Sequence, residues 1–220
     1  MIPTVKIRYA RTDSLLAPGG LDRFMRALSC GQQAAVGRYV RREDRCRALL
    51  GRILIRELLK AFGFDARLLG KIRFTAYRRP YLDLPLDFNL AHSGNLVVCA
   101  GSLDCRVGID IEKIKDIDYH PFRPMLTDGE WRRIRNAGDP RAEFFRTWVR
   151  KESVAKADGR GLFFPFDQLE TNFQIVAAGE AVWHLTDLDH WSGYAACLAG
   201  SRPGLEMDIR RYDLPLEMAG

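Results

Sequence analysis

Apolar residues recur along this chain with two different periods, and the change between them predicts a mixed fold. From about residue 32 to residue 62, apolar side chains return at three- and four-residue steps, the period of a helix with one buried face. This stripe consists of Cys46, Leu49, Leu50, Ile53, Leu54 and Leu58. A second helix is expected to begin after Asp139, with Pro140 at its first position, and to end near Asp158 and Gly159.

Short apolar runs predict the strands. In the first half they are residues 5–9, 74–77, 86–90 and 96–100. In the second half they are 107–112, 172–177, 181–185, 194–198 and 206–212, and the last four are expected to complete a second sheet. Residues 98–101 loosely resemble 196–200. The predicted fold class is therefore α+β, with two similar α/β subdomains in one chain related by pseudo-twofold symmetry, at residues 1–105 and 106–220.

The composition is that of an ordinary soluble protein. The chain has 220 residues, 47% of them hydrophobic and 28% charged, which is enough to bury a core. No apolar run approaches the roughly 20 residues that span a bilayer, and the N-terminus lacks the apolar stretch of a secretory signal. We therefore expect a cytoplasmic protein without a membrane partner. Five cysteines without a C-x-x-C pair are interpreted as small buried hydrophobes in a reducing compartment: Cys30, Cys46, Cys99, Cys105 and Cys197.

The formal net charge of +6 favours an acidic partner or ligand. Basic residues surround the apolar stripe of the first helix, and this pattern has two interpretations: a solvated helix face, or a binding surface for phosphate. These residues are Arg38, Arg41, Arg42, Arg45, Arg47, Arg52, Arg56 and Lys60.

Two carboxylates project from one face of a predicted strand. Alternate side chains of a strand share a face, so Val107, Ile109 and Ile111 would enter a core. Asp110 and Glu112 would then point together to the opposite side. Carboxylates this close repel one another unless a cation lies between them, and hard oxygen ligands suit magnesium. The alternative is an exposed strand face with two solvated acids.

The predicted second helix brings Trp148, Glu152 and Lys156 to one face, because they lie at successive four-residue steps. Glu152 is a candidate third metal carboxylate. Lys156 is a candidate cation for a phosphate group, since a lysine supplies a mobile point charge with three donors. The alternative is a Glu–Lys surface pair beside a core aromatic residue.

A polar segment at residues 89–94 is expected to form a turn between two apolar strands. His92 and Ser93 could donate hydrogen bonds to a phosphate, assisted by free backbone N–H groups near Gly94. The alternative is ordinary turn chemistry, which asparagine, serine and glycine provide in many proteins.

In combination, these three segments resemble the 4'-phosphopantetheinyl transferase superfamily. The shared order is H-S-G at residues 92–94, G-I-D-I-E at 108–112 and W-x-x-K-E-x-x-x-K at 148–156, followed by G-R-G-L at 159–162. The resemblance spans residues 88–161, about a third of the chain. The chain length resembles the long, surfactin-type members, which are single chains of two similar halves. This form implies a monomer with its active site between the halves.

The resemblance implies transfer of the 4'-phosphopantetheine group from coenzyme A to a serine of an apo acyl or peptidyl carrier protein. Adenosine 3',5'-bisphosphate would be released. Asp110, Glu112 and Glu152 would hold Mg²⁺ against the pyrophosphate of coenzyme A, and Lys156 would contact the same phosphates. A base must accept the serine proton, and Glu152 is the first candidate and Glu112 the second.

The same resemblance assigns residues to the nucleotide end of coenzyme A. His92 and Ser93 would bind it, including its 3'-phosphate. Arg79 is the basic residue of a basic-proline segment at 77–81, and Arg47 lies in a further family-like stretch at 42–51.

The chain departs from the family pattern around this nucleotide site. Ala91 stands where related sequences often carry a serine. Gln32, Gln33 and Ala35 stand where they often carry lysines just before the long first helix, and nearby arginines are candidate substitutes: Arg38, Arg41 and Arg42.

Three other functions predict different features. A nucleic-acid-binding module would interleave aromatic with basic residues, but Tyr39 is the only aromatic residue between Arg38 and Arg56, so we expect no nucleic-acid partner. A magnesium-dependent phosphohydrolase would release phosphopantetheine without a carrier, and a silent family member would bind coenzyme A without turnover. Residues 113–135 mix apolar and charged side chains, which fits either a carrier-docking surface or a plain connection.

Overall fold

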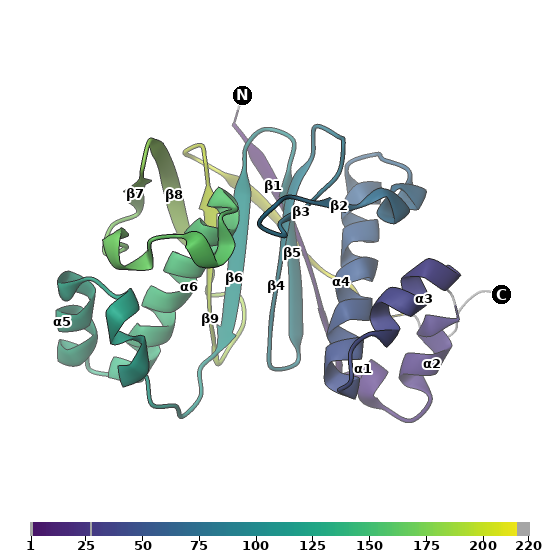
Figure 1. The fold of residues 1–220 in the computed structure, drawn as a ribbon, viewed down its shortest axis with the longest axis horizontal. Coiled ribbons are helices and arrows are strands. Elements are labelled where there is room, and N and C mark those ends of the chain that lie inside the picture. The colour runs from purple at the N-terminus through teal and green to yellow at the C-terminus, as the bar shows by residue number, and fades with distance from the viewer. Residues whose placement is uncertain (1, 27, 215–220) are drawn as a thin grey trace.

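The computed structural model describes residues 2–26 and 28–214. Two four-stranded sheets lie side by side at the centre, and helices lie on the two outer flanks (Figure 1). The α+β class is confirmed, while the pseudo-twofold relation between the halves stays a prediction. No helix in these ranges is long and apolar enough to cross a membrane.

The first sheet has the strand order β10-β1-β5-β4. Its strands are β1 (Thr4–Arg11), β4 (Asp87–Ser93), β5 (Leu96–Ser102) and β10 (Glu206–Arg211). The helices on its flank are α1 (Asp13–Leu16), α2 (Gly20–Met25), α3 (Cys30–Gly37), α4 (Arg42–Ala61) and the 3₁₀ helix η1 (Ala66–Lys71). A small hairpin of β2 (Arg73–Phe74) and β3 (Pro80–Tyr81) connects this flank to β4.

The second sheet has the strand order β6-β9-β8-β7. Its strands are β6 (Val107–Lys113), β7 (Ile175–Ala178), β8 (Ala181–Asp187) and β9 (Tyr194–Gly200). Its helices are α5 (Asp128–Asn136), α6 (Pro140–Asp158) and the 3₁₀ helices η2 (His120–Met125), η3 (Gly161–Phe163) and η4 (Phe166–Gln168). The predicted start of α6 is confirmed, since Asp139 caps the helix by accepting from the Ala142 N–H group at 3.0 Å.

The first predicted helix is wrong in one respect, because residues 32–62 contain two helices. α3 ends at Gly37, and Arg41 adopts an extended backbone (φ −78°, ψ 138°) before α4 begins. The apolar stripe starts only at Cys46, so the earlier residues have no continuous buried face that would hold them in the same helix.

The last predicted strand belongs to the other sheet. β10 pairs in parallel with β1, with Ile209 opposite Ile7, instead of completing the second sheet. Both sides of the preceding strand, β9, are already occupied by β6 and β8, whereas β1 offers an open side. The chain therefore crosses between the halves a second time after Gly200.

Three apolar clusters form the core. One lies between α4 and the first sheet, and a second lies between α6 and the second sheet. The third joins the two sheets to each other and includes Ile7, Val98, Ile109 and Leu198, each with an exposed fraction of 0%. Because this cluster is shared, the halves pack as one body and hold the facing strands in a fixed relation.

The interpretation of the cysteines is confirmed for Cys46, Cys99 and Cys197, which are buried. It is wrong for Cys30, which is exposed in the first turn of α3, and for Cys105, which is half-buried in the connection between the halves. Neither of these two lies on a periodic apolar face, so nothing drives them fully into the core.

Candidate active site

The predicted acidic residues lie where two edge strands face each other. β4 is the last strand of the first sheet and β6 the first of the second, and the two run side by side (Figure 1). The apolar residues of β6 are buried as predicted, which sends Asp110 and Glu112 to its other face. Asp110 is 4% exposed and Glu112 is half-buried.

Helix α6 packs against β6 and brings Glu152 and Lys156 to the same place. The Lys156 Nζ atom lies 2.6 Å from Asp110 Oδ1. The four-residue spacing on α6 alone suggests a surface pair between Lys156 and Glu152. The structure shows that Lys156 also connects α6 to the acidic strand β6.

The pKa directions indicate that the three carboxylates lie close enough to repel one another. Partial burial raises the pKa of Glu152, and repulsion from Asp110 raises it further, against the attraction of Lys156. Burial also raises the pKa of Glu112, against the hydrogen bond from Ser93. Such a cluster is stabilised by any cation that enters it.

We tested whether these residues fit a divalent cation. In the part of the chain that the structure describes, no group of three histidine, cysteine, aspartate or glutamate side chains is arranged as a ready metal site. Lys156 instead pairs with Asp110, as described above. However, Asp110 Oδ2 is buried without a hydrogen-bond partner among residues 2–26 and 28–214, and the donors are all carboxylate oxygens, which magnesium prefers. The donor set therefore fits magnesium.

The predicted turn at residues 89–94 is wrong for most of its length. β4 continues through Ser93, which pairs with Leu96 of β5, so the turn consists of Gly94 and Asn95 alone. Gly94 has φ +55°, which a two-residue hairpin requires and glycine adopts readily.

Placing these residues in a strand separates His92 from Ser93, because neighbouring side chains point to opposite faces. Ser93 joins the acidic residues: its hydroxyl donates to Glu112 Oε2 at 2.6 Å and accepts from the Lys113 N–H group at 3.0 Å. His92 is exposed and lines a cavity on the other side.

Side chains of β4 join it to β6 without a continuous backbone ladder. Three of them accept hydrogen bonds from backbone N–H groups of β6: Asp87 from Val107 at 2.7 Å, Asn89 from Ile109 at 3.5 Å and Ser93 from Lys113 at 3.0 Å. This contact was not predicted. The sequence does contain a signal for it. The polar residues at 87, 89 and 93 lie an even number of positions apart, so they share one face of the strand.

Arg79 lies between the halves. Its guanidinium donates to both carboxylate oxygens of Asp87 at 2.8 Å, to the Lys156 carbonyl oxygen at 3.0 Å and to the Val107 carbonyl oxygen at 3.1 Å. Its side chain is only 10% exposed. These bonds connect the β2–β3 hairpin to β4, β6 and the end of α6, so the geometry favours a positioning role. Binding of coenzyme A by Arg79 stays a prediction.

Replacing Asp87 with asparagine should destabilise the fold by about 2 kcal/mol, because it leaves the charge of Arg79 largely enclosed and unpaired. The matched control is Asp83→Asn, since Asp83 pairs with Arg73 but both side chains are 65% exposed. That control should change stability by less than about 0.5 kcal/mol. Urea unfolding measures both variants, and equal effects would contradict the role of Asp87.

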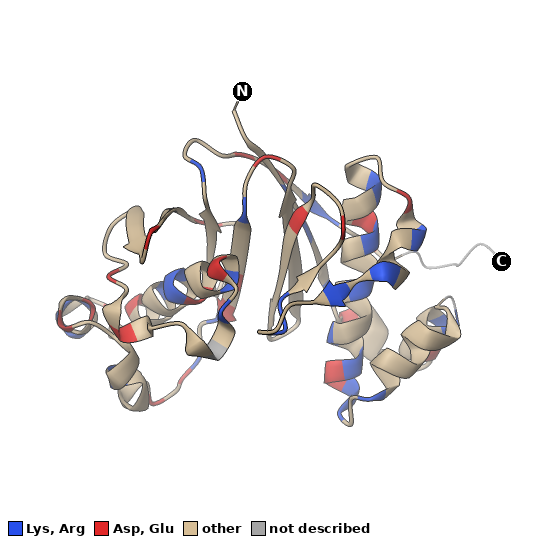
Figure 2. Cartoon of the chain, turned by 45° about the horizontal axis from the view of Figure 1, so that its top comes forward, with Lys and Arg blue, Asp and Glu red and all other residues tan. Residues whose placement is uncertain are grey.

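A cavity of about 550 Å³ lies in the first half, between α4 and the hairpin that contains His92. Arg47 stands on its wall, where it donates to the Gly94 carbonyl oxygen at 3.1 Å and pairs with Asp44 at 2.8 Å. The cavity therefore contains two of the predicted nucleotide-binding residues, Arg47 and His92, on the basic helix α4 and on β4. Figure 2 shows the lysine and arginine positions along α4.

Lys151, the lysine of the W-x-x-K-E segment, is buried behind the site with an exposed fraction of 0%. Its Nζ atom lies 2.8 Å from Glu130 Oε2 and donates to the carbonyl oxygens of Phe166 and Leu169. It therefore fixes α6 to α5 and to the chain that follows α6.

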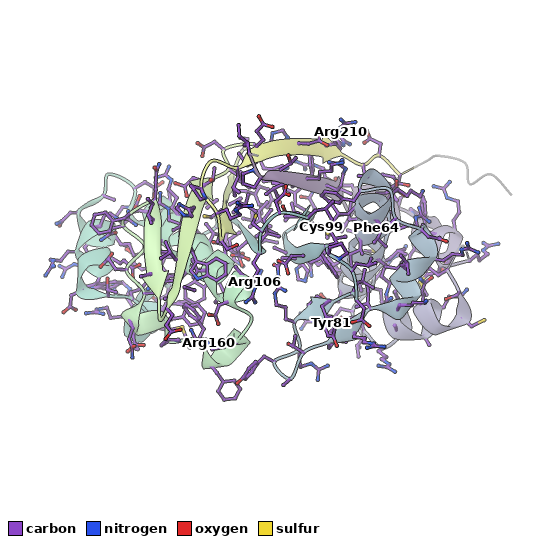
Figure 3. All side chains as sticks on the ribbon, turned by 90° about the horizontal axis from the view of Figure 1, so that it is seen from above. Phe64, Tyr81, Cys99, Arg106, Arg160 and Arg210 are labelled. Atoms are coloured by element: carbon purple, nitrogen blue, oxygen red, sulfur yellow. The ribbon has the colours of Figure 1, made fainter. Side chains whose placement is uncertain are left out.

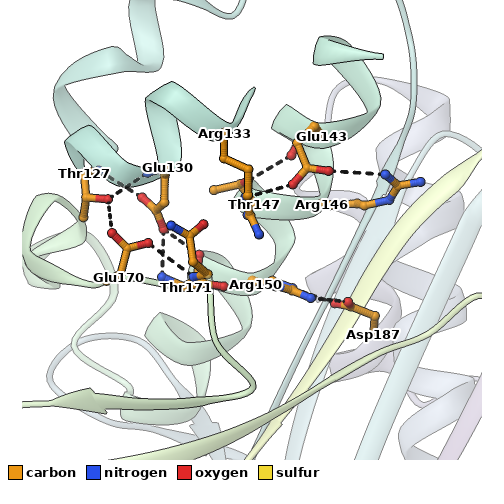
Figure 4. Close-up of polar contacts among 11 residues, drawn as sticks. Thr127, Glu130, Arg133, Glu143, Arg146, Thr147, Arg150, Glu170, Thr171 and Asp187 are labelled. Atoms are coloured by element: carbon orange, nitrogen blue, oxygen red, sulfur yellow. Dashed lines mark hydrogen bonds and ion pairs between the residues drawn. The ribbon is translucent and has the colours of Figure 1, made fainter. Parts of the chain in front are cut away.

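Glu130 extends this buried contact into a network (Figure 4). It accepts from the N–H group of Thr127 at 2.9 Å, which forms a capping box at the start of α5. It also accepts from the N–H group and the hydroxyl of Thr171, at 2.9 and 2.6 Å. Glu152 follows Lys151 on α6, so this network holds the helix that carries the candidate base.

Seen from above, the two halves lie side by side, with Arg160 on one and Tyr81 on the other (Figure 3). The structure brings five of the predicted residues together between β4, β6 and α6: Ser93, Asp110, Glu112, Glu152 and Lys156. Two others, Arg47 and His92, face the adjacent cavity.

Comparison with known proteins identifies the class. Residues 18–104 match the family model "4'-phosphopantetheinyl transferase, N-terminal", and residues 106–199 match the model of the 4'-phosphopantetheinyl transferase superfamily. The chain belongs to the 4'-phosphopantetheinyl transferase superfamily, in the long form, because the two models match successive parts of one chain.

The relatives are transferases of bacteria and mammals. A 4'-phosphopantetheinyl transferase of Bacillus subtilis is 34% identical over 180 residues, which cover 77% of each chain. One of Aneurinibacillus migulanus is 35% identical over 139 residues, which cover 62% of this chain and 58% of that relative. The human L-aminoadipate-semialdehyde dehydrogenase-phosphopantetheinyl transferase is 29% identical over 197 residues, which cover 77% of this chain and 62% of that relative.

Proposed function

We propose that this chain transfers the 4'-phosphopantetheine group from coenzyme A to a serine of an apo acyl or peptidyl carrier protein. The observation that carries the proposal is the meeting of the acidic face of β6 with Glu152 and Lys156 of α6, beside a basic cavity. Family membership is in accord with this reaction.

Asp110, Glu112 and Glu152 would hold Mg²⁺, which when bound would neutralise charge on the pyrophosphate of coenzyme A. Lys156 would exchange its contact with Asp110 for a phosphate oxygen. Its ammonium group suits this exchange, because it sits on a flexible stem and the side chain is 29% exposed.

The carrier serine would attack the β-phosphorus of coenzyme A. A bond forms between the serine oxygen and phosphorus, and the bond from phosphorus to the bridging oxygen breaks, which releases adenosine 3',5'-bisphosphate. Such a transfer depends on in-line positioning and charge neutralisation more than on covalent help from the protein.

Glu152 is the proposed general base for the serine proton, and Glu112 is the second candidate. Glu112 Oε2 already accepts the Ser93 hydroxyl at 2.6 Å, which fixes that carboxylate and occupies one of its lone pairs. No such bond restrains Glu152 within the described residues, so its oxygens are available to an incoming hydroxyl.

The proposed partner is an acidic carrier protein, which the net charge of +6 would attract. In the segment at 113–135, Ile114, Ile117, Tyr119 and Phe122 pack against the second core cluster, and Met125 is 43% exposed. Docking would therefore use the charged and exposed positions of this segment. We expect a monomer in the cytoplasm.

Intact-protein mass spectrometry tests the reaction. An apo carrier protein incubated with the enzyme, coenzyme A and magnesium should gain the mass of one phosphopantetheine group, and EDTA should prevent the gain. A carrier with its acceptor serine changed to alanine is the control. Release of phosphopantetheine without a carrier would support the phosphohydrolase instead, and coenzyme A binding without any gain across fatty-acid, polyketide and peptide carriers would support the silent member.

A further inference from the structure

The two sheets differ in the strands at their outer edges. β10 and β7 are the edge strands on the sides away from β4 and β6. Four of the six residues of β10 are charged, whereas none of the four residues of β7 is. Charged side chains on an edge strand hinder its pairing with another chain. The edge of β10 is therefore protected against such pairing, and the edge of β7 is not.

The open side of β7 presents unpaired backbone groups. The Leu185 N–H group of β8 donates to the Gln174 carbonyl oxygen at 2.7 Å. In an antiparallel ladder, residues whose N–H and C=O groups face the partner strand alternate with residues whose groups face away. The backbone groups of Ile175 and Ala177 therefore point away from β8, and no strand pairs with them within residues 2–26 and 28–214.

Apolar side chains accompany this open edge. Val176 packs into the core cluster under α6, so Ile175 and Ala177 point to the opposite face of the strand. Val182 lies opposite Ala177 on β8 and extends the same face. Ile175 is 61% exposed, Val182 is 48% exposed, and Phe173, two residues before β7, is 67% exposed. Apolar side chains gathered on an open strand edge mark a contact surface.

The lack of charge at this edge favours a second copy of the chain as its partner. In a twofold pair the same segment of both copies meets, so a charged strand would face its own charge. Residues 171–179 contain no charged side chain. Glu180 lies in the turn after β7, and antiparallel pairing keeps its two copies at opposite ends of the strand. A partner attracted by charge would find nothing to bind here, whereas a second copy supplies a neutral strand of the same length.

We propose that two copies of this chain dimerise by antiparallel pairing of their β7 strands, which joins two four-stranded sheets into one. The twofold axis passes beside Val176, so Ile175 of each copy exchanges backbone hydrogen bonds with Ala177 of the other. β7 is at the opposite edge of its sheet from β6, so both candidate active sites stay open (Figure 1). Because the strand is short, the contact is expected to bury less than the about 1,200 Å² of a standard interface. The dimer is therefore weak, and the chain is a monomer at low concentration.

Sedimentation velocity of the full chain tests this proposal. The wild-type chain should change from monomer to dimer as its concentration rises from about 1 μM to about 500 μM. Ile175→Lys should remove the dimer over the same range, because it places a charge on the pairing edge. A wild-type chain that is still monomeric at the highest concentration would overturn the proposal.

Ala177→Pro tests the backbone contact separately. Proline removes an N–H group that points to the open side and is not bonded to β8, so β7 can keep its place in the sheet. This variant should be monomeric, with the circular dichroism spectrum and melting temperature of the wild-type chain. A dimer of unchanged strength in both this variant and Ile175→Lys would reject pairing through β7.

A control and a double variant test the edge and its register. Met207 is 38% exposed on β10, the other outer edge, so Met207→Lys should dimerise like the wild-type chain. The double variant Ile175→Lys with Ala177→Glu should recover the dimer, because antiparallel pairing sets the two introduced charges opposite each other across the axis. No recovery in the double variant, or loss of the dimer in Met207→Lys, would contradict the proposed pairing.

Discussion

Glu152→Gln should abolish transfer of phosphopantetheine while the fold remains intact. Glutamine has nearly the same size, but the substitution removes the proposed base. It also removes one of the three mutually repelling carboxylates, which are Asp110, Glu112 and Glu152. Loss of a general base alone costs about 10²–10⁴-fold, so we expect the rate to fall at least about 10³-fold when a metal ligand is lost with it. The rate is measured by the mass gain of the carrier.

Stability separates a catalytic defect from a structural one in this variant. The melting temperature of Glu152→Gln should equal or slightly exceed that of the wild-type chain, since repulsion within the cluster decreases. Glu180→Gln is the control, because Glu180 is an exposed turn residue between β7 and β8, and it should retain full activity. Substantial transfer by Glu152→Gln would reject the assigned role of this carboxylate.

Lys151→Met should destabilise the protein by about 3–5 kcal/mol, because it leaves the carboxylate of Glu130 buried without its cation. Methionine keeps most of the volume of lysine, so the loss reflects charge and hydrogen bonds more than a cavity. Unfolding in urea measures the effect. The dependence of the unfolding free energy on urea concentration should be the same in the variant and the wild-type chain.

A second substitution shows whether the uncompensated charge is the cause. The double variant Lys151→Met with Glu130→Gln should recover part of the loss, because the amide can still accept from Thr171 and carries no charge. Lys60→Met is the control: Lys60 pairs with Glu57 but is 52% exposed, so its loss should cost less than about 1 kcal/mol. If Lys151→Met cost no more than this control, the buried pair would have no special role.

The acidic strand and α6 were predictable because their signals are local. The alternation around Asp110 determines which side chains leave the core, and the cap at Asp139 determines where α6 starts. These two patterns place Asp110 and Glu112 on one strand face and Lys156 on a helix, whereas the expectation that they share a site comes from the family resemblance. The structure supplies the contact at 2.6 Å between Asp110 and Lys156.

The partners of other residues depend on contacts between distant parts of the chain, which no local pattern encodes. Arg79 is recognisable as the basic residue of a sequence motif, but its hydrogen-bond partners, such as Asp87 and Lys156, lie 8 to 77 positions away in the sequence. His92 and Ser93 resemble a turn by composition, yet pairing with β5 extends the strand through both. The position of β10 likewise depends on which strand has a free side.

The pairing of β10 with β1 links folding to the order of synthesis. β10 follows β1 by about 200 residues, so during translation the side of β1 that pairs with β10 has no partner until those residues have emerged from the ribosome. A growing chain therefore carries an unpaired strand edge, which can pair with another chain, between the synthesis of β1 and that of β10. The first sheet reaches its four-stranded form only after the second half has left the ribosome.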